Sequence, residues 1–347
     1  MTPGAAATFS VYGYSFTLTG NCAFAREGLA EDFGFFATRA ETEWGRLGYV
    51  TIELVEGVPD YDSLPVCDAA VYTPRNVVYR HQGLRIIDFS GRGLGIYDAR
   101  EARFRMVSED QDLVYEAAYL FLLSQIGQAL DGRGMHRLHA LAMSHRGRAI
   151  LVLLPMGGGK STLGTALLKQ SAMSILSDDS PFIDRAGNAL AFPLRLGLLK
   201  GREHEVPEEH RRMVHRMEFG PKYLVNYSHF ASRVVDRATP GLLLLGRRTL
   251  AEKGRVEKAP YRLAMQDMLP NMIVGIGLFQ GLEYLLDRSA LEVAGKAGLG
   301  WSRLRNAHTL VRASRTFLFH MGRSAGDNAR MVMELADQIF SGSNVLP

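Results

Sequence analysis

The sequence predicts an α/β protein whose N-terminal part is a β-rich α+β domain. Three observations support this fold class. The length of 347 residues is typical of about two domains. Short aromatic and β-branched runs dominate residues 9–105, whereas strand-like and helix-like segments alternate after residue 135. We therefore expect an accessory domain over 1–107, a connecting helix over 108–134 and an α/β domain over 135–347.

The composition is that of an ordinary folded protein. Hydrophobic residues make up 47% of the chain and charged residues 22%, which supplies enough apolar material for a sizeable core. The formal net charge of +4 is small and no Lys/Arg block occurs, so we expect no nucleic-acid partner. The two cysteines, Cys22 and Cys67, form no disulfide framework and favour a cytoplasmic location. The N-terminus does not resemble a secretory signal, and no apolar run reaches about 18 residues, so no membrane association is expected.

The N-terminal segment contains the signals of several strands. The runs "FSVYGYSFTL" (9–18) and "GYVTIELV" (48–55) are aromatic and β-branched, which favours strands. Short alternating runs broken by Pro or Gly over 69–98 are typical of hairpins. The run "AREGLAEDFGFF" (25–36) predicts a short helix. No catalytic constellation is visible in this part, which indicates an accessory role.

A helix is predicted over residues 109–130. Apolar residues recur there at helical spacing, among them Leu113, Ala117 and Leu120. Ser108, followed by two acidic residues, can cap the start, and "DGRG" (131–134) ends the helix.

The rest of the chain alternates between strands and helices. The expected elements are, in order, a hairpin over 138–155 with its turn at 145–148, a helix over 161–170, a strand within 172–184 that ends in acids, a β segment over 187–193, a charged stretch over 200–222, a buried strand at 240–246, helices within 266–296, a strand at 315–322 and a helix at 326–340.

The stretch "LPMGGGKSTL" (154–163) predicts a phosphate-binding loop. It matches the last three positions of the pattern GxxxxGK[ST], although Leu154 stands where that pattern begins with glycine. Three consecutive glycines, Gly157, Gly158 and Gly159, permit backbone angles that let successive N–H groups converge on an anion. The preceding apolar run predicts a strand and the following residues a helix, which is the context that the motif requires.

The residues after the glycines have the chemistry that a nucleotide needs. Lys160 supplies a positive charge for the β- and γ-phosphates of ATP, and Ser161 a hydroxyl ligand for Mg²⁺. Thr162 follows within the first turn of the helix, whose dipole places its positive end at the phosphates. The alternative is a glycine-rich turn with an incidental lysine.

Two adjacent acids, Asp178 and Asp179, follow a predicted strand. One can hold the metal ion, and the other can accept a proton from an attacking hydroxyl group. Both reach one site only if the strand ends or bends there, because adjacent strand residues point to opposite faces. A solvated turn is the alternative.

Two further side chains are candidates. His139 is on the strand expected beside the loop strand, and is either a satisfied core histidine or a member of the site. Lys222 follows the charged stretch from 201, whose weak core periodicity predicts a flexible lid. On such a lid Lys222 would neutralise charge on the transferred phosphoryl group; otherwise it is a surface lysine.

The segments 138–163 and 175–184 ("ILSDDSPFID") resemble the HPr kinase/phosphorylase family and the wider group of HPr kinase-related proteins. The resemblance implies an HPr kinase-like P-loop nucleotide-binding core, shared with ATP-dependent phosphoenolpyruvate carboxykinase, as an ATP-binding catalytic domain over 135–347. It also implies ATP and Mg²⁺ as cofactors.

Carried over residue by residue, the resemblance implies that the glycine run, Lys160 and Ser161 bind the phosphates and Mg²⁺. It implies Asp178 as the catalytic base and Asp179 as a metal ligand, or the reverse, and it implies that His139 lies near the phosphates. The stretch "PLRLGLLK" (193–200) lacks the acid that the family carries there.

The expected function is an ATP-dependent kinase that phosphorylates a hydroxyl group, on a serine of a peptide or protein or on a small molecule. Two alternatives remain: a P-loop ATPase or nucleotide switch that hydrolyses ATP without an acceptor, and an inactive scaffold that binds nucleotide for stability. A homo-oligomer is possible. The acceptor itself is not predicted.

Overall fold

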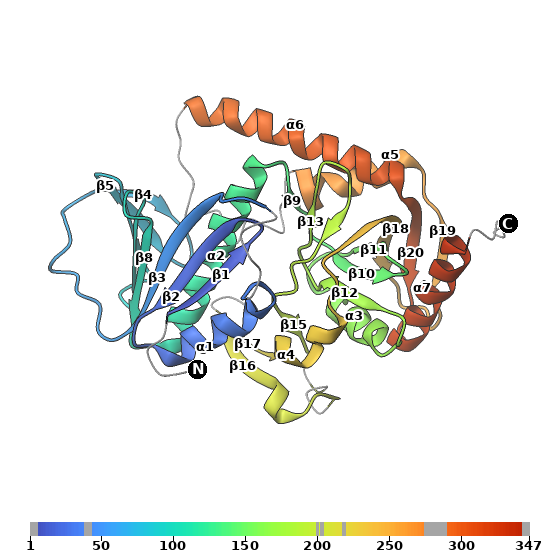
Figure 1. Ribbon diagram of the computed structural model, residues 1–347, viewed down its shortest axis with the longest axis horizontal. Helices are drawn as coiled ribbons and strands as arrows, with labels where there is room; N and C mark the ends of the chain where they lie inside the picture. The colour runs from blue at the N-terminus through green and yellow to red at the C-terminus, as the bar shows by residue number, and fades with distance from the viewer. Residues whose placement is uncertain are drawn as a thin grey trace. The chain divides into compact units, whose positions relative to one another are not determined.

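The computed structural model describes residues 6–37, 44–198, 201, 205–216, 220–273 and 290–341 (Figure 1). It confirms a mixed α/β protein built on large mixed sheets. The described residues group into two compact units. The N-terminal unit contains the chain up to residue 130 together with 207–228, and the C-terminal unit contains the remainder.

The N-terminal unit combines an eight-stranded sheet with a small hairpin and helices. Its strands are β1 (Ala7–Val11), β2 (Tyr14–Thr19), β3 (Gly48–Glu56), β4 (Ala69–Tyr72), β5 (Val77–His81), β6 (Leu84–Asp88), β7 (Leu94–Asp98), β8 (Arg103–Ser108), β16 (Arg211–Arg216) and β17 (Gly220–Val225). Its helices are α1 (Ala23–Asp32), the 3₁₀ turns η1 (Gly34–Phe36) and η3 (Glu208–His210), and α2 (Gln111–Gly132), while α4 (Tyr227–Phe230) lies at the boundary between the units.

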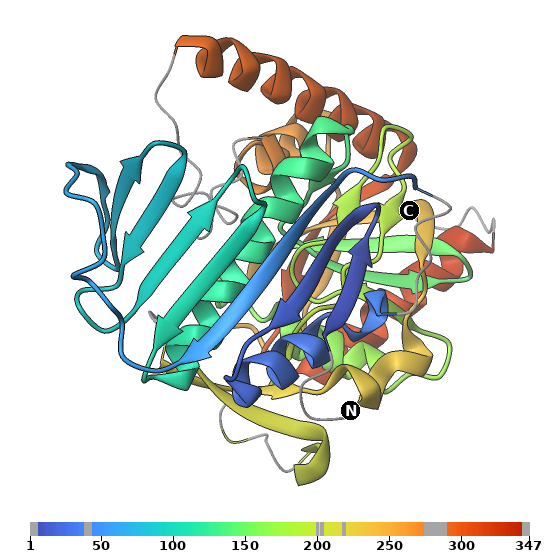
Figure 2. The ribbon, with the colours of Figure 1, turned by 60° about the vertical axis from the view of Figure 1, so that its left-hand side comes forward.

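The long helix α2 lies along one face of the eight-stranded sheet (Figure 2). The ring of Phe121 stacks on Phe104 of β8 at a centroid distance of 4.0 Å, and Tyr97 of β7 meets the same ring at 5.0 Å. Among the described helices, α2 alone is long and apolar enough to cross a bilayer, and 78% of its most apolar window is buried inside the protein. Packing on the sheet therefore explains the apolar composition of α2, and it places the expected connecting helix in the N-terminal unit.

The start of α2 corrects one expectation. The carboxylate of Asp110 accepts the N–H of Leu113 at 3.2 Å and so caps the helix. Ser108, the expected cap, instead donates its hydroxyl to the carbonyl oxygen of Arg92 at 2.6 Å. Asp110 caps the helix because it directly precedes Gln111, the first helical residue, and so occupies the N-cap position.

The hairpin β16–β17 occupies much of the stretch expected to be a flexible lid. Arg212 of β16 forms an ion pair with Asp32 of α1, which is 1% exposed, and the hydroxyl of Tyr115 donates to the same carboxylate at 2.6 Å. These contacts explain why residues 207–228 group with the N-terminal unit. Closure of this segment over a nucleotide remains a prediction.

The C-terminal unit is built on a nine-stranded sheet with helices packed against it. The nine strands of this sheet are β9 (His136–Arg137), β10 (Leu141–His145), β11 (Arg148–Leu153), β12 (Ser174–Ser177), β13 (Phe182–Ile183), β14 (Ala189–Leu190), β18 (Arg237–Arg248), β19 (Arg255–Lys258) and β20 (Arg315–Met321). The short strand β15 (Leu196–Gly197) is not part of it. Its helices are α3 (Lys160–Leu168), the 3₁₀ turn η4 (Ala231–Arg233), α5 (Tyr261–Met268), the π-helical turn η5 (Leu269–Ile273), α6 (Ala290–Ala313) and α7 (Ala325–Phe340).

Strand directions in this sheet bring several chain segments to one edge. Strands β11, β18 and β20 are parallel neighbours, and β10 pairs antiparallel with both β11 and β12. The C-terminal ends of β11, β12, β18 and β20 therefore lie at the same edge. The expected hairpin is confirmed as β10–β11, with positive φ at Arg146 (51°) and Gly147 (74°) in its turn. The predicted helix after the glycines is confirmed as α3.

Candidate functional site

The glycine loop, residues 154–159, joins the end of β11 to the start of α3. Gly159 is the N-cap of α3 and has a φ of +103°, which side-chain-bearing residues rarely adopt. A Cβ on Gly158 would lie 2.8 Å from the carbonyl oxygen of Pro155, which the Gly158 N–H already contacts at 2.9 Å. The loop is therefore a tight turn that needs glycine at these two positions.

Leu154 occupies the place where the phosphate-loop pattern begins with glycine. Its side chain is 2% exposed and packs against Gly246 of β18. A Cβ on Gly246 would approach Leu154 Cδ2 to 2.5 Å. Because Gly246 has no side chain, β18 leaves room for the leucine at position 154.

The first turn of α3 points free backbone donors out of the helix. Leu163 is the first residue whose N–H is bonded within the helix, to the carbonyl of Gly159 at 3.0 Å. The N–H groups of Lys160, Ser161 and Thr162 precede it and have no intrahelical acceptor. With the helix dipole, they make this end of α3 attractive to an anion.

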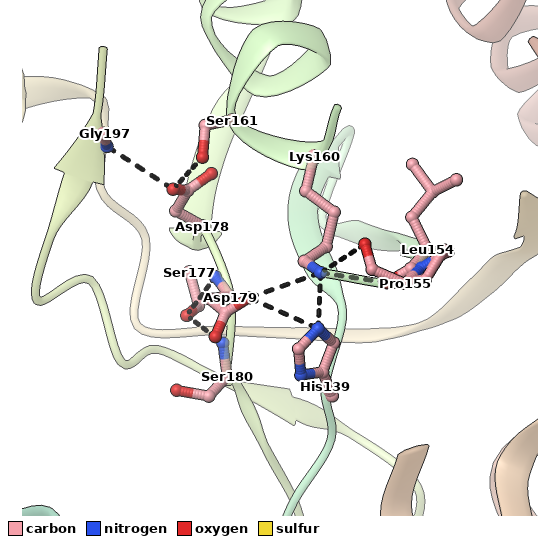
Figure 3. Close-up of polar contacts among 10 residues, drawn as sticks. All are labelled: His139, Leu154, Pro155, Lys160, Ser161, Ser177, Asp178, Asp179, Ser180 and Gly197. Atoms are coloured by element: carbon pink, nitrogen blue, oxygen red, sulfur yellow. Dashed lines mark hydrogen bonds and ion pairs between the residues drawn. The ribbon is translucent and has the colours of Figure 1, made fainter. Parts of the chain in front are cut away.

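Lys160 is the centre of a polar cluster (Figure 3). Its side chain is 7% exposed, and its Nζ lies 2.5 Å from His139 Nε2 and 2.9 Å from the carbonyl oxygen of Leu154. The Pro155 carbonyl oxygen at 3.5 Å and Asp179 Oδ1 at 3.4 Å complete its surroundings. Because an ammonium group can only donate, a hydrogen bond from Lys160 requires His139 Nε2 to act as the acceptor.

The two acids lie on different sides of this cluster (Figure 3). Asp178 is 6% exposed, accepts the Ser161 hydroxyl at 2.6 Å and faces the N–H of Gly197 at 3.5 Å. The side chain of Asp179 is 56% exposed and faces Lys160 and His139, with His139 Nε2 at 3.6 Å.

Both acids reach the site because β12 ends at Ser177. The Ser177 hydroxyl accepts the N–H groups of Asp179 at 3.4 Å and Ser180 at 3.0 Å, which turns the chain directly after the strand. The N–H of Ala140 bonds to the carbonyl of Asp179 at 3.0 Å, so the segment that carries His139 runs beside the acids. The geometric condition stated for an acid pair at one site is thus met.

The structure brings His139, the glycine loop, Lys160, Ser161 and both acids together within the C-terminal unit. Thr162 lies in the same helical turn and is half-buried. Lys222 is on β17 in the N-terminal unit and is not a member of this cluster. Gly197, within the stretch 193–200, offers a backbone N–H to Asp178.

Sequence reasoning missed Arg248, at the end of β18. Its Nη1 lies 4.0 Å from the position that a Cβ on Gly159 would take. Two arginines, Arg247 and Arg248, follow the buried run "GLLLLG", and they were the available signal, since polar residues that follow buried parallel strands meet at one sheet edge.

A second polar cluster in the same unit is structural. His136 is fully buried and contacts Asp131 Oδ1 at 2.6 Å through Nδ1 and the Ser302 hydroxyl at 2.8 Å through Nε2, while Arg303 donates to Asp131 Oδ2 at 2.7 Å. Burial raises the pKa of Asp131, but the hydrogen bonds and charges of His136 and Arg303 outweigh it and hold the pKa below its usual value. The Asp131–His136–Ser302 contacts have the order of a hydrolase catalytic triad, but a triad also needs backbone N–H groups that stabilise an oxyanion beside the serine. Ser302 lies within the long helix α6, where the backbone N–H groups are already bonded.

No protein-family model matches the chain, and no curated protein is similar enough to it to count as a match.

Proposed function

We propose that this protein is an ATP-dependent kinase with an HPr kinase-like P-loop core, and that it transfers the γ-phosphoryl group of ATP to a hydroxyl acceptor. The acceptor is a serine of a peptide or protein, or a small molecule. The observation that carries the proposal is the grouping of a glycine loop, a buried lysine and two acids in different surroundings at one edge of the sheet. The first two features bind a polyphosphate, and the acids divide metal binding from proton transfer.

The phosphates of ATP would occupy the N-terminus of α3. There the backbone donors of the first turn and the ammonium of Lys160 neutralise their charge. In the structure that ammonium bonds to the carbonyl of Leu154 and to His139, so a phosphate oxygen would replace one of these acceptors. Such an exchange leaves no buried donor unsatisfied.

The residues present fit the Mg²⁺ ion that accompanies ATP. Ser161 and Asp178 offer a hydroxyl and a carboxylate oxygen side by side, and oxygen atoms are the ligands that Mg²⁺ prefers. The described residues contain no group of three His, Cys, Asp or Glu side chains that could hold a metal on its own. This suits an ion whose remaining ligands are phosphate oxygens and water.

Asp179 is the base in this proposal, with Asp178 on the metal side. The resemblance allows Asp178 as base with Asp179 as metal ligand, or the opposite assignment, and the proposal takes the opposite one. Asp179 is the more exposed acid, so an acceptor can reach it, and its neighbours Lys160 and His139 lie where the phosphates would be. Asp179 takes the proton of the acceptor hydroxyl while the acceptor oxygen bonds to the γ-phosphorus. The bond from phosphorus to the β,γ-bridging oxygen breaks, and ADP leaves.

The test compares ADP release with phosphorylation of the acceptor. Purified protein, ATP and Mg²⁺ are incubated with fractions of a cell extract, and each fraction is analysed by intact-mass measurement. We expect slow ADP release alone, faster release with one fraction, and a component of that fraction that is heavier by one phosphoryl group. The matched control is Lys160→Met, which should release no ADP with any fraction.

Other outcomes would support the alternatives. Fast ADP release that no fraction accelerates, with no phosphorylated component, would establish an ATPase. Nucleotide binding without any turnover would establish an inactive scaffold.

A further inference from the structure

Arg248 places its guanidinium beside the glycine loop. It is the last residue of β18, which runs parallel to β11, so the two strands end at the same edge. Its Nη1 lies 4.0 Å from where a Cβ on Gly159 would stand, and Met321 Cε of β20 borders the same space at 3.9 Å. Glycine at this N-cap therefore leaves room between the arginine and the positive end of α3.

The two neighbouring arginines, Arg247 and Arg248, differ in their hydrogen bonds and ion pairs. Arg247 donates to Asp267 at 2.8 Å and to the carbonyl of Gly246 at 2.9 Å. Arg248 is exposed and makes no hydrogen bond or ion pair within the part of the chain that the structure describes. A guanidinium held next to a helix N-terminus, with no carboxylate partner, is repelled until an anion binds between them.

We propose that Arg248 is a further phosphate-binding residue that contacts the terminal phosphates of the nucleotide. The proposal rests on the proposed function, because it takes the glycine loop as the phosphate site. The β- and γ-phosphates are chosen over the α-phosphate because Gly159 directly precedes Lys160, the residue assigned to them. A guanidinium fork matches two phosphate oxygens at once and keeps its charge at every working pH.

The test measures the dissociation constants of ATP, ADP and AMP for Arg248→Met, Arg248→Lys and Lys160→Met at fixed ionic strength. Arg248→Met should weaken ATP and ADP binding about tenfold or more, the loss expected for a charge-assisted hydrogen bond, and AMP binding less than about twofold. Arg248→Lys should recover part of the loss. Arg315→Met is the matched control: it also removes an exposed arginine, but at the other end of β20, about 20 Å from the loop edge.

The outcomes separate this inference from the proposed function. If Lys160→Met weakens ATP binding but Arg248→Met does not, the role of Arg248 is refuted and the phosphate loop stands. Equal losses for AMP and ATP would also overturn it, since a contact with the terminal phosphates cannot affect AMP. If neither variant changes ATP affinity, the loop is not a phosphate site and both proposals fall.

Discussion

Replacing the two acids one at a time by asparagine should separate their roles. In Asp178→Asn, a buried carboxylate that accepts the Ser161 hydroxyl at 2.6 Å becomes an amide. Loss of a charge-assisted hydrogen bond at a buried site costs about 1.5–3 kcal/mol. For a unit of this size that lowers the melting temperature by about 2–4 °C for each kcal/mol. Asp179→Asn changes a side chain that is 56% exposed, so its stability should change by less than about 0.5 kcal/mol.

The activities should differ as well. Without the carboxylate of Asp178, the Mg²⁺ concentration for half-maximal turnover should rise about tenfold or more. Asp179→Asn should leave the Mg²⁺ titration and ATP affinity near wild type but lower kcat by about 10²–10⁴-fold, because the proton acceptor is lost.

The assay is acceptor-dependent ADP release across a Mg²⁺ series, with thermal unfolding measured on the same samples. Glu334→Gln, an exposed acid on α7, controls for the loss of one negative charge. If Asp179→Asn shifts the Mg²⁺ titration and Asp178→Asn does not, the two roles are exchanged. Wild-type turnover in both variants would refute any catalytic role for the pair.

Three further predictions concern the same unit. Lys160→Met should abolish nucleotide binding measured by calorimetry, and it should also destabilise the protein by about 1–3 kcal/mol, because His139 and a loop carbonyl lose a buried donor. In Gly158→Ala the new Cβ would lie 2.8 Å from a loop carbonyl oxygen, so ATP affinity should fall, whereas Gly326→Ala, which meets nothing within 4 Å, should bind ATP normally. The pKa of Asp131 is lowered on folding, so its contribution to stability is present above its unfolded pKa and is lost as the pH falls. The difference in urea stability between wild type and Asp131→Asn should therefore shrink below about pH 4, and a difference that grows instead would contradict the lowered pKa.

Local patterns in the sequence predicted most of the elements. The β10–β11 hairpin, the helix after the glycines, the buried strand β18 and the strand–helix pair β20–α7 were all expected, because periodicity and turn residues act over a few positions. The cap of α2 was wrongly placed at Ser108, since the choice among three adjacent polar residues depends on where the first helical turn begins. The described part of the expected lid contains the β16–β17 hairpin, and Arg212 ties that hairpin to the buried carboxylate of Asp32, 180 positions away in the sequence, which local patterns could not predict.

The sequence by itself identified the glycine run, Lys160, Ser161 and the acid pair as candidates, but it also offered Lys222, which lies in the other unit, and it did not point to Arg248. The run from Gly157 to Ser161 and the acid pair are motifs of adjacent residues, and such motifs can be recognised in a sequence without knowing the fold. The tertiary structure alone decided how these groups face one another. Burial of Asp178 with Ser161, exposure of Asp179, the contact of His139 with Lys160 and the position of Arg248 all depend on where strands end at one sheet edge, which is set by pairing between segments distant in the chain.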